Sequence, residues 1–269
     1  MEILNNRLPQ VAILYICTGK YNRFFADFYK SAQAHLLVGL ADVEYFVFTD
    51  DLTLQHDSNV HLLYKDCQGF PLDTLFRFKT FLTIEDELTR FDYIYFMNAN
   101  ALVVEDIGSE IFPPNHSFVG SRWVQQKPID WPMFYPYERN KESTSYIAPF
   151  EKESYIHYMG GFYGAQTDEF LKMTHILAHN IDIDYEKGII AIAHDQCHIN
   201  HYFRSHTCKL LPTGYCIPEE WAKGYPARKI IFRNKTIIDP AFVKGSNLTC
   251  FQQFKKTLYI ITRAIRWYI

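Results

Sequence analysis

The chain has 269 residues, of which 48% are hydrophobic, 21% charged and 17% aromatic. This composition excludes a disordered or collagen-like chain, and the length allows one large domain or two small ones. The formal net charge of −3 argues against a nucleic-acid-binding protein. It conceals an asymmetry: residues 1–209 carry 17 basic and 27 acidic side chains, whereas residues 210–269 carry 10 and 3. A cationic C-terminal segment on an acidic body predicts an anionic partner, either a phosphate group or a membrane surface.

The N-terminal residues lack the basic and apolar regions of a signal peptide. No stretch approaches the roughly 20 uninterrupted apolar residues that span a bilayer. The six cysteines form no Cys-x-x-Cys pair, which disfavours a zinc ribbon, and we expect them to be reduced. These features together predict a cytoplasmic protein.

Strand-like and helical segments alternate along the first hundred residues. Apolar runs predict strands at 11–17, 43–49 and 93–97, and helical spacing predicts helices at 22–38 and 72–89. The alternation predicts an α/β fold with a mostly parallel sheet covered by helices on both faces. Residues 18–21, 50–51 and 98–100, which follow the three strands, should therefore share the carboxyl edge of the sheet, where such folds bind ligands.

The later segments are less regular. Residues 112–150 are rich in proline and aromatic residues without clear periodicity, and they predict a long functional loop. Residues 158–165 predict a glycine-rich strand and turn, residues 167–180 and 194–203 predict helices, and residues 251–269 predict a terminal helix. We expect a single catalytic domain at 1–249, followed by a basic amphipathic helix at 250–269.

Two amides, Asn98 and Asn100, follow the strand at 93–97 and precede another apolar run. In nucleotide-sugar transferases this position carries the paired carboxylates of a DxD motif, which hold a divalent metal against the diphosphate. Neutral amides cannot supply that charge, so Mg²⁺ or Mn²⁺ binding is disfavoured. Taken alone, the two amides favour a simple turn that ends the strand.

Seven segments in order give these amides a context: residues 15–21, 47–50, 76–80, 96–100, 137–143 with 146–147, 158–164, and 194–203. Through them the chain resembles glycosyltransferase family six over residues 11–239. That family includes the histo-blood-group A and B transferases, the α-1,3-galactosyltransferases and bacterial relatives, and Asn-Ala-Asn is characteristic of the bacterial branch. The resemblance implies a GT-A fold with a twisted, mostly parallel mixed sheet. It also implies retaining transfer of a galactose-type sugar from a UDP donor to a galactosyl acceptor.

The resemblance assigns the donor side. It implies that Ile16, Thr18 and Tyr21 form the uridine pocket, with the Tyr21 ring against the uracil, unless these residues simply pack the strand end. It implies that Arg77 reaches the donor's phosphate or sugar, although Arg77 and Lys79 are also consistent with two solvated charges on a helix.

Without a metal, cationic side chains must offset the charge that develops on the departing UDP. Loss of one preorganised group of this kind costs about 3–4 kcal/mol. By its match to the family, Lys235 is our candidate, with Lys229 and Arg233 as alternatives. The competing interpretation of this charge run is a solvated face.

Met159, Gly160 and Gly161 occupy the element that lines the donor sugar in this family. The resemblance implies that Gly161 leaves room for an N-acetyl group, because galactose-specific relatives have alanine there. One methyl group discriminates by only about 1–3 kcal/mol. We therefore expect UDP-N-acetylgalactosamine in preference to UDP-galactose, unless the glycines form a β-bulge without donor contact.

For the acceptor, Trp123, Tyr135 and His116 are candidates to stack on a galactose or to meet its hydroxyls, and His194 is a further candidate. Family position directs Asp195 to the hydroxyls of the donor sugar. His194 and His198 lack a correctly spaced third ligand, so a metal site there is disfavoured and His198 is interpreted as structural.

Gln196 departs from the family pattern, which is His-Asp-Glu-Ser-His. The missing carboxylate is the family's candidate nucleophile or cation-stabilising group, and an amide provides neither function. Either the carboxylate was replaced to trap an intact complex, which we favour, or UDP departs on the front face and Gln196 only orients groups. Both explanations predict activity well below that of the Gln196→Glu variant.

The terminal segment places an apolar stripe beside basic residues and a Trp-Tyr pair suited to a lipid headgroup boundary. The stripe consists of Phe251, Phe254, Leu258, Ile261, Ile265 and Ile269. The helix either docks on its own domain or lies on an anionic membrane.

The sequence thus predicts a metal-independent, retaining α-1,3-N-acetylgalactosaminyltransferase that needs no cofactor. Its acceptor would be a galactoside, such as the fucosylated galactose of the H structure, in a bacterial cytoplasm. Three alternatives stay open: the same reaction with UDP-galactose, a nucleotide-sugar-binding pseudoenzyme, and a lectin-like module.

Overall fold

A computed structural model describes residues 7–114, 116–123, 131–150, 154–237 and 250–269. In this part of the chain, one strand of the seven-stranded main sheet runs against the direction of the other six. The strands in spatial order are β3 (Val60–Tyr64), β2 (Asp42–Thr49), β1 (Gln10–Ile16), β4 (Tyr93–Asn98), the reversed β7 (Tyr158–Gln166), β6 (Phe118–Arg122) and β8 (Cys208–Leu211). A second sheet has the order β5 (Ala101–Val103), β10 (Ile230–Phe232) and β9 (Ile217–Pro218). The predicted α/β class and mostly parallel sheet are confirmed.

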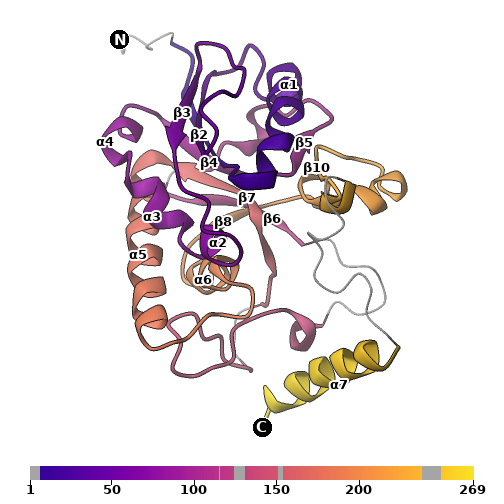
Figure 1. Cartoon of the computed structure of the whole chain (residues 1–269). Helices are drawn as coiled ribbons and strands as arrows, with labels where there is room; N and C mark the ends of the chain where they lie inside the picture. The colour runs from indigo at the N-terminus through magenta and orange to yellow at the C-terminus, as the bar shows by residue number, and fades with distance from the viewer. Residues whose placement is uncertain (1–6, 115, 124–130, 151–153, 238–249) are drawn as a thin grey trace.

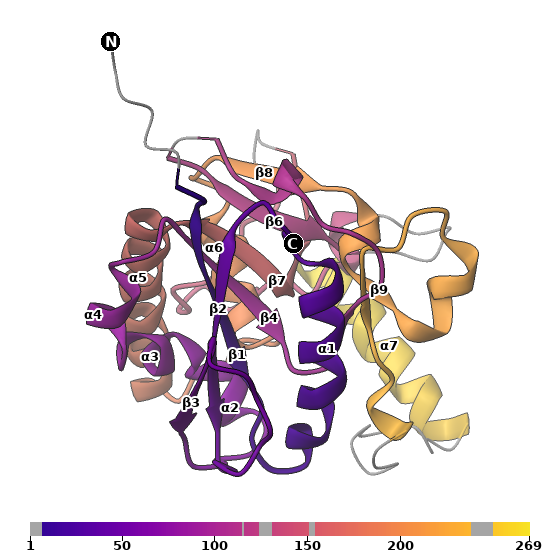
Figure 2. The same cartoon turned by 90° about the horizontal axis from the view of Figure 1, so that it is seen from above.

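Helices cover both faces of the main sheet (Figures 1 and 2). The helices of the described residues are α1 (Phe25–His35), α2 (Leu72–Leu75), α3 (Arg77–Leu82), α4 (Glu85–Leu88), α5 (Thr167–Glu186), α6 (Asp195–Tyr202) and, apart from the sheet, α7 (Cys250–Arg266). Because β1 is flanked by strands on both edges and by helices on both faces, its residues 11–15 are fully buried. One core cluster joins β1 to α1, β5 and β10, and another joins it to α3, α5 and α6.

Two helix predictions were wrong in their extent. The helix predicted at 22–38 starts only at Phe25, after the 3-10 turn η1 (Gly19–Phe24), and ends at His35 because the chain bends through Leu37 at φ 52°. The helix predicted at 72–89 is three short helices, since the backbone leaves helical geometry at Phe76 and Ile84.

The glycine-rich segment and the predicted long loop also differ from expectation. Residues 118–122 form β6, a sheet strand inside the segment predicted as loop, which is too short to show periodicity. The segment predicted as strand and turn is the nine-residue strand β7. Its pairing with β6 is irregular: Gly120 pairs with Tyr163, but Arg122 pairs with Tyr158. The extra β7 residues between these pairs form a bulge around Gly160 and Gly161.

The terminal helix α7 lies apart from the sheet (Figure 1). It meets the body near its C-terminal end, where Ala264 and Trp267 are buried and the Trp267 indole N–H donates to the Ile147 carbonyl at 2.9 Å. Among the described residues, no helix is long and apolar enough to cross a bilayer.

Candidate active site

Three strand ends meet at the carboxyl edge of the main sheet, as predicted. The Gly19 N–H donates to both carboxylate oxygens of Asp50, at 2.9 and 3.1 Å, and the Asn22 amide donates to the same group at 2.8 Å. Ile16, the last residue of β1, pairs in register with Asn98. Thr18 is buried, and its hydroxyl donates to Asp73 at 3.1 Å. The residues predicted for the uridine pocket therefore line one edge beside the two amides.

The amides of Asn98 and Asn100 form a clamp on the end of β10. The Asn98 amide N–H donates to Asn100 Oδ1 at 2.8 Å, and the Asn100 amide N–H donates to the Arg233 carbonyl at 2.7 Å. The Arg233 N–H returns a 2.8 Å bond to the Asn100 carbonyl. Among the described residues, no three His, Cys, Asp or Glu side chains lie close enough together to hold a metal ion. The clamp thus brings the basic segment after β10 to this edge.

The clamp places two of the three predicted cationic residues, Lys235 and Arg233, at this edge of the sheet. The Lys235 Nζ lies 5.0 Å above the Tyr21 ring, and the Arg233 guanidinium lies 5.4 Å from the Phe24 ring and 2.5 Å from Asp27. Lys229 lies at the opposite end of β10, where its ammonium contacts the Asp106 carbonyl and is 3.8 Å from Glu110. The structure does not bring the Lys229 side chain to the site.

Arg77 and Asp195 form a buried ion pair behind β7. Arg77 Nε lies 3.1 Å from Asp195 Oδ2, Nη1 donates to the Gly160 carbonyl at 2.9 Å, and the guanidinium lies 4.3 Å from the Phe96 ring centre. Burial raises the pKa of Asp195 to about 6, and the nearby Arg77 charge opposes that rise. The solvated-charge interpretation of Arg77 is therefore wrong, whereas Lys79 is a half-exposed side chain paired with Asp182. Asp195 Oδ2 is buried, and apart from its ion pair with Arg77 it accepts no hydrogen bond from the described residues.

Gln196 is held in one orientation by two partners. The Gly160 N–H donates to Gln196 Oε1 at 2.9 Å, and Gln196 Nε2 lies 2.8 Å from His157 Nε2. Because a backbone N–H can only donate, Oε1 must face Gly160 and the amide N–H must face the histidine. His157 Nε2 is therefore the acceptor, which requires a neutral ring with its proton on Nδ1.

His157 was not predicted, and it joins Gln196 to an aromatic group. Its buried ring stacks on Tyr135, with centres 5.4 Å apart, and lies 6.2 Å from Trp123. Trp123 in turn lies 6.2 Å from Trp221, which was also not predicted. Tyr135 is only 2% exposed and cannot offer a face to a sugar, so its assignment to the acceptor was wrong. The one available signal for His157 was its place directly before the glycine-rich element.

The structure places His194 and His116 in different parts of the molecule. His194 precedes α6 at φ 53°, strained for a residue with a side chain, and its ring lies edge-on to Phe70 with centres 4.7 Å apart. Burial lowers its pKa. His116 lies at the opposite edge of the sheet, where its N–H donates to Gln166 at 3.3 Å; Gln166 pairs with Tyr93, at the start of β4. The prediction of His116 as an acceptor residue is therefore contradicted by its position.

The space beside Gly161 is filled. A Cβ at Gly161 would lie 2.6 Å from the tip of the Phe232 ring, whereas one at Gly160 would lie 3.2 Å from Gln196 Cβ and 3.5 Å from Asp195 Oδ2. Met159 is half-buried and packs on the core. The room that the sequence assigned to an N-acetyl group at Gly161 is thus taken by Phe232 in this structure.

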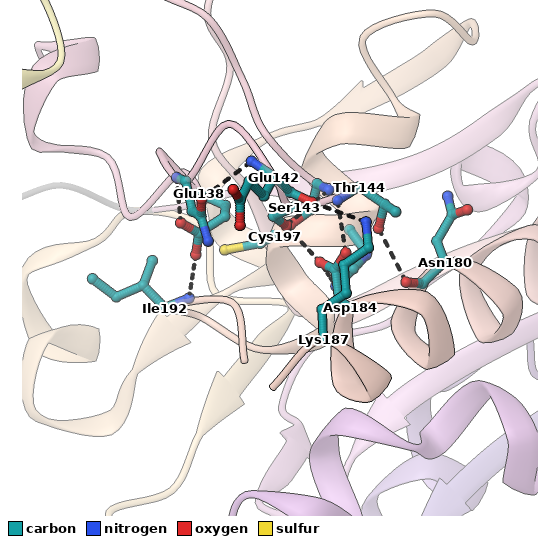
Figure 3. A network of polar contacts seen from close by, with 12 residues as sticks. Glu138, Glu142, Ser143, Thr144, Asn180, Asp184, Lys187, Ile192 and Cys197 are labelled. Atoms are coloured by element: carbon teal, nitrogen blue, oxygen red, sulfur yellow. Dashed lines mark hydrogen bonds and ion pairs between the residues drawn. The ribbon is translucent and has the colours of Figure 1, made fainter. Parts of the chain in front are cut away.

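A polar network holds α6 in place (Figure 3). Glu138 accepts the N–H groups of Asn140 and Ile192 at 2.8 and 2.9 Å. Asp184 accepts the Ser143 hydroxyl at 2.5 Å and the Thr144 N–H at 2.8 Å. These bonds tie residues 138–144 to α5 and to the segment before α6. His198 is 1% exposed on the inner side of α6, 3.8 Å from Asp184, and burial lowers its pKa to about 4, in keeping with a structural histidine.

Comparison with known proteins agrees with this arrangement. The sequence pattern of glycosyltransferase family 6 matches residues 5–237. The chain is 33% identical over 227 residues to the O-antigen biosynthesis glycosyltransferase WbnI of Escherichia coli, covering 84% of this chain and 94% of WbnI. It is 26% identical over 243 residues to globoside alpha-1,3-N-acetylgalactosaminyltransferase 1 of Gallus gallus, covering 84% of this chain and 66% of that protein. It is 24% identical over 222 residues to histo-blood group ABO system transferase 2 of Rattus norvegicus, covering 79% and 63%. The mostly parallel sheet of this α/β fold, the amide clamp at its carboxyl edge and these matches together show that the chain belongs to glycosyltransferase family 6 and is a transferase.

Proposed function

We propose that the chain is a metal-independent, retaining α-1,3-N-acetylgalactosaminyltransferase of the family's bacterial branch. It would move the sugar from UDP-N-acetylgalactosamine to a terminal galactose, such as that of the H structure. The amide clamp carries the proposal: Asn98 and Asn100 stand where related enzymes have carboxylates, and they secure the segment that sets Lys235 above Tyr21. That placement supports cationic side chains in the role of a metal, without a separate cofactor.

In this proposal each group has a defined task. Tyr21 meets the uracil, and Lys235 with Arg233 faces the diphosphate and offsets the charge that UDP gains on departure. Asp195, held beside Arg77, accepts a hydroxyl of the donor sugar. Trp123 and His194 border the acceptor, whose attacking hydroxyl gives its proton to the departing phosphate oxygen. Gln196 orients these groups but cannot neutralise a cationic sugar.

The donor is supported by the family resemblance and by the similarity to the globoside alpha-1,3-N-acetylgalactosaminyltransferase of Gallus gallus. The steric argument at Gly161 does not add to that support, because Phe232 occupies the space. UDP-galactose therefore stays the alternative donor for the same reaction.

Transfer assays test the proposal directly. UDP-N-acetylgalactosamine and UDP-galactose are each offered with a fucosylated galactoside, in EDTA and in Mn²⁺. We expect faster transfer from UDP-N-acetylgalactosamine, with no gain from Mn²⁺. A strict need for Mn²⁺ would contradict metal independence. UDP binding without transfer, even by Gln196→Glu, would instead favour a nucleotide-sugar-binding pseudoenzyme.

We also propose that residues 250–269 contact the cytoplasmic face of a membrane, which carries anionic lipid. The observation in favour is that α7 docks at one end yet leaves Phe251, Phe254 and Leu258 more than half exposed. Co-sedimentation with anionic vesicles, with and without residues 250–269, tests this contact. Equal binding of both proteins would contradict it.

A further inference from the structure

A cavity of about 500 Å³ lies between α7 and the segment 139–150, away from the donor edge. Four of its lining side chains are cationic: Arg139, Lys141, Arg263 and Arg266. No lining residue in the described part of the chain has an acidic side chain. Even with a terminal carboxylate at Ile269, the cations would remain in excess. The cavity is therefore a centre of positive potential.

The two inner arginines are fixed and lack a carboxylate partner in the cavity. Arg139 donates to the Met133 carbonyl at 2.6 Å and to the Arg263 carbonyl, while Arg263 donates to the Tyr137 carbonyl. Burial, followed by the neighbouring Arg263 charge, lowers the pKa of Arg139 to about 10, and burial lowers that of Arg263. An anion in the cavity would relieve this repulsion. Guanidinium groups held in place suit a phosphate, whose oxygens accept paired N–H bonds.

Five of the eight remaining lining residues that the structure describes are aromatic. They are Tyr146, Phe150, Tyr259, Trp267 and Tyr268, and the Phe150 and Tyr268 rings lie 4.9 Å apart. Aromatic rings beside cations are typical of the boundary between lipid headgroups and acyl chains. The lining thus fits an amphiphile better than a free inorganic ion.

The apolar stripe of α7 borders the same cavity. Phe251, Phe254, Leu258, Ile261 and Ile265 are 44–65% exposed, and they face away from the docked residues Ala264 and Trp267. At 3.6 residues per turn, Thr262 and Arg266 lie between the stripe and the docked side, and both line the cavity. A surface that receives the stripe would therefore meet the cationic cavity at its edge.

We propose that this cavity binds the phosphate of an anionic phospholipid headgroup while the stripe enters the acyl boundary. Arg139 and Arg263 form its floor, and the exposed Lys141 and Arg266 close on the headgroup from two different segments. The proposal rests on the membrane contact proposed above and assigns it a specific site. It is independent of sugar transfer, because no donor or acceptor residue lines the cavity.

Vesicle binding by single charge variants tests the site. The variants are Arg266→Gln, Lys141→Gln and, as a control of equal charge, Lys255→Gln; Lys255 is exposed on α7 outside the cavity. With vesicles of phosphatidylglycerol in phosphatidylcholine, we expect Arg266→Gln and Lys141→Gln each to weaken binding at least fivefold, and Lys255→Gln about twofold. Equal losses in all three would show diffuse charge attraction and overturn the site. Tight binding to pure phosphatidylcholine would overturn it too.

A soluble probe separates the headgroup site from the stripe. Glycerol 1-phosphate should raise the melting temperature of the unaltered chain and of Leu258→Ser, but not that of Arg266→Gln with Lys141→Gln. Leu258→Ser should lose vesicle binding while keeping the response to glycerol 1-phosphate. No response of the unaltered chain would overturn the proposal. Transfer to a soluble acceptor, measured on the same proteins, reports separately on the transferase function.

Discussion

Two neighbouring glycines of β7 face different layers of the molecule. Gly160 faces α6 and α3, where its N–H binds Gln196 of α6 and its carbonyl binds Arg77 of α3. Gly161 faces β10, where the Phe232 ring closes the space. The bulge in the pairing of β6 with β7 lies at this point. One strand thus serves a polar, charged face and an apolar face.

This comparison indicates that charge interactions hold the Gly160 face of β7 rigid, whereas side-chain packing holds the Gly161 face rigid. On the Gly160 face, a buried carboxylate and a buried guanidinium depend on each other, so loss of one leaves an uncompensated charge. On the Gly161 face, an aromatic ring backs the segment that leads to Lys235, and changes there cost only packing energy. Substitutions on the first face should therefore have the larger effects.

Arg77→Ala should have the largest effect on stability. It leaves the buried Asp195 carboxylate without its ion-pair partner and the Gly160 carbonyl without its donor. We expect a loss of about 3–5 kcal/mol in the free energy of unfolding, measured by urea denaturation. Lys79→Ala, two residues along α3, removes a half-exposed ion pair and should cost less than about 1 kcal/mol.

A double-mutant cycle sharpens this test. Adding Asp195→Asn to Arg77→Ala removes the stranded charge and should recover a large part of the loss. If Arg77→Ala and Lys79→Ala cost the same, or if Asp195→Asn brings no recovery, the ion pair is not what stabilises the Gly160 face.

Gln196→Glu should have the largest effect on activity. The carboxylate keeps the shape of the amide, still accepts the Gly160 N–H, and adds a negative charge beneath the developing sugar cation. We expect the transfer rate to rise about 100- to 1000-fold, the range seen for a single preorganised electrostatic group. Equal turnover of the two proteins would remove residue 196 from the mechanism.

The same variant should change the state of His157. Facing an amide N–H, its Nε2 has to accept, whereas facing a carboxylate it has to donate. We therefore expect the pKa of His157 to be higher in Gln196→Glu than in the unaltered chain, measured by ¹⁵N NMR of the imidazole. An unchanged pKa would contradict the hydrogen-bond assignment independently of any activity.

The buried Asp195 also predicts how stability depends on pH. Its pKa is about 6 in the folded chain, against 3.8 for an unperturbed aspartate. Between these values the folded chain keeps a proton that the unfolded chain has lost, so stability falls as the pH rises from 4 to 6. The fall should be about 3 kcal/mol relative to Asp195→Asn, in which this group does not titrate. Parallel curves for the two proteins over that range would contradict the burial of a titrating carboxylate.

The sequence was sufficient to predict the sheet edge but not the contacts across it. Apolar runs predicted β1, β2 and β4, and parallel strands bring their ends together whatever the side chains do. His157 and Phe232 could not be found in this way, because their roles depend on a bulge and on a three-residue strand, neither of which has a periodicity. Arg77 was placed on the correct helix, yet its burial depends on α6, more than a hundred residues away.

Lys235 and Lys229 test whether the position of a lysine at one end of β10 matters for transfer. Both lysines flank β10, but only Lys235 is held above Tyr21. We expect Lys235→Met to lower the transfer rate about 10- to 100-fold in EDTA, within the range for a group that offsets leaving-group charge. Lys229→Met loses only its contacts with Asp106 and Glu110 and should change the rate less than about threefold. A comparable loss in both variants would assign the effect to general charge rather than to position.

Gly161→Ala should have the smallest effect and the most local cause. The added methyl group would lie 2.6 Å from the Phe232 ring tip, so the ring has to move within a packed core, at a cost of about 1–2 kcal/mol in the free energy of unfolding. Gly224→Ala is the control, because a Cβ there meets nothing within 4 Å. Shortening the ring with Phe232→Leu makes room for the methyl group, so the double variant should lose less stability than the two single variants combined. Strict additivity would show that the ring and Gly161 are not in contact, and the apolar face of β7 would then need another explanation for its rigidity.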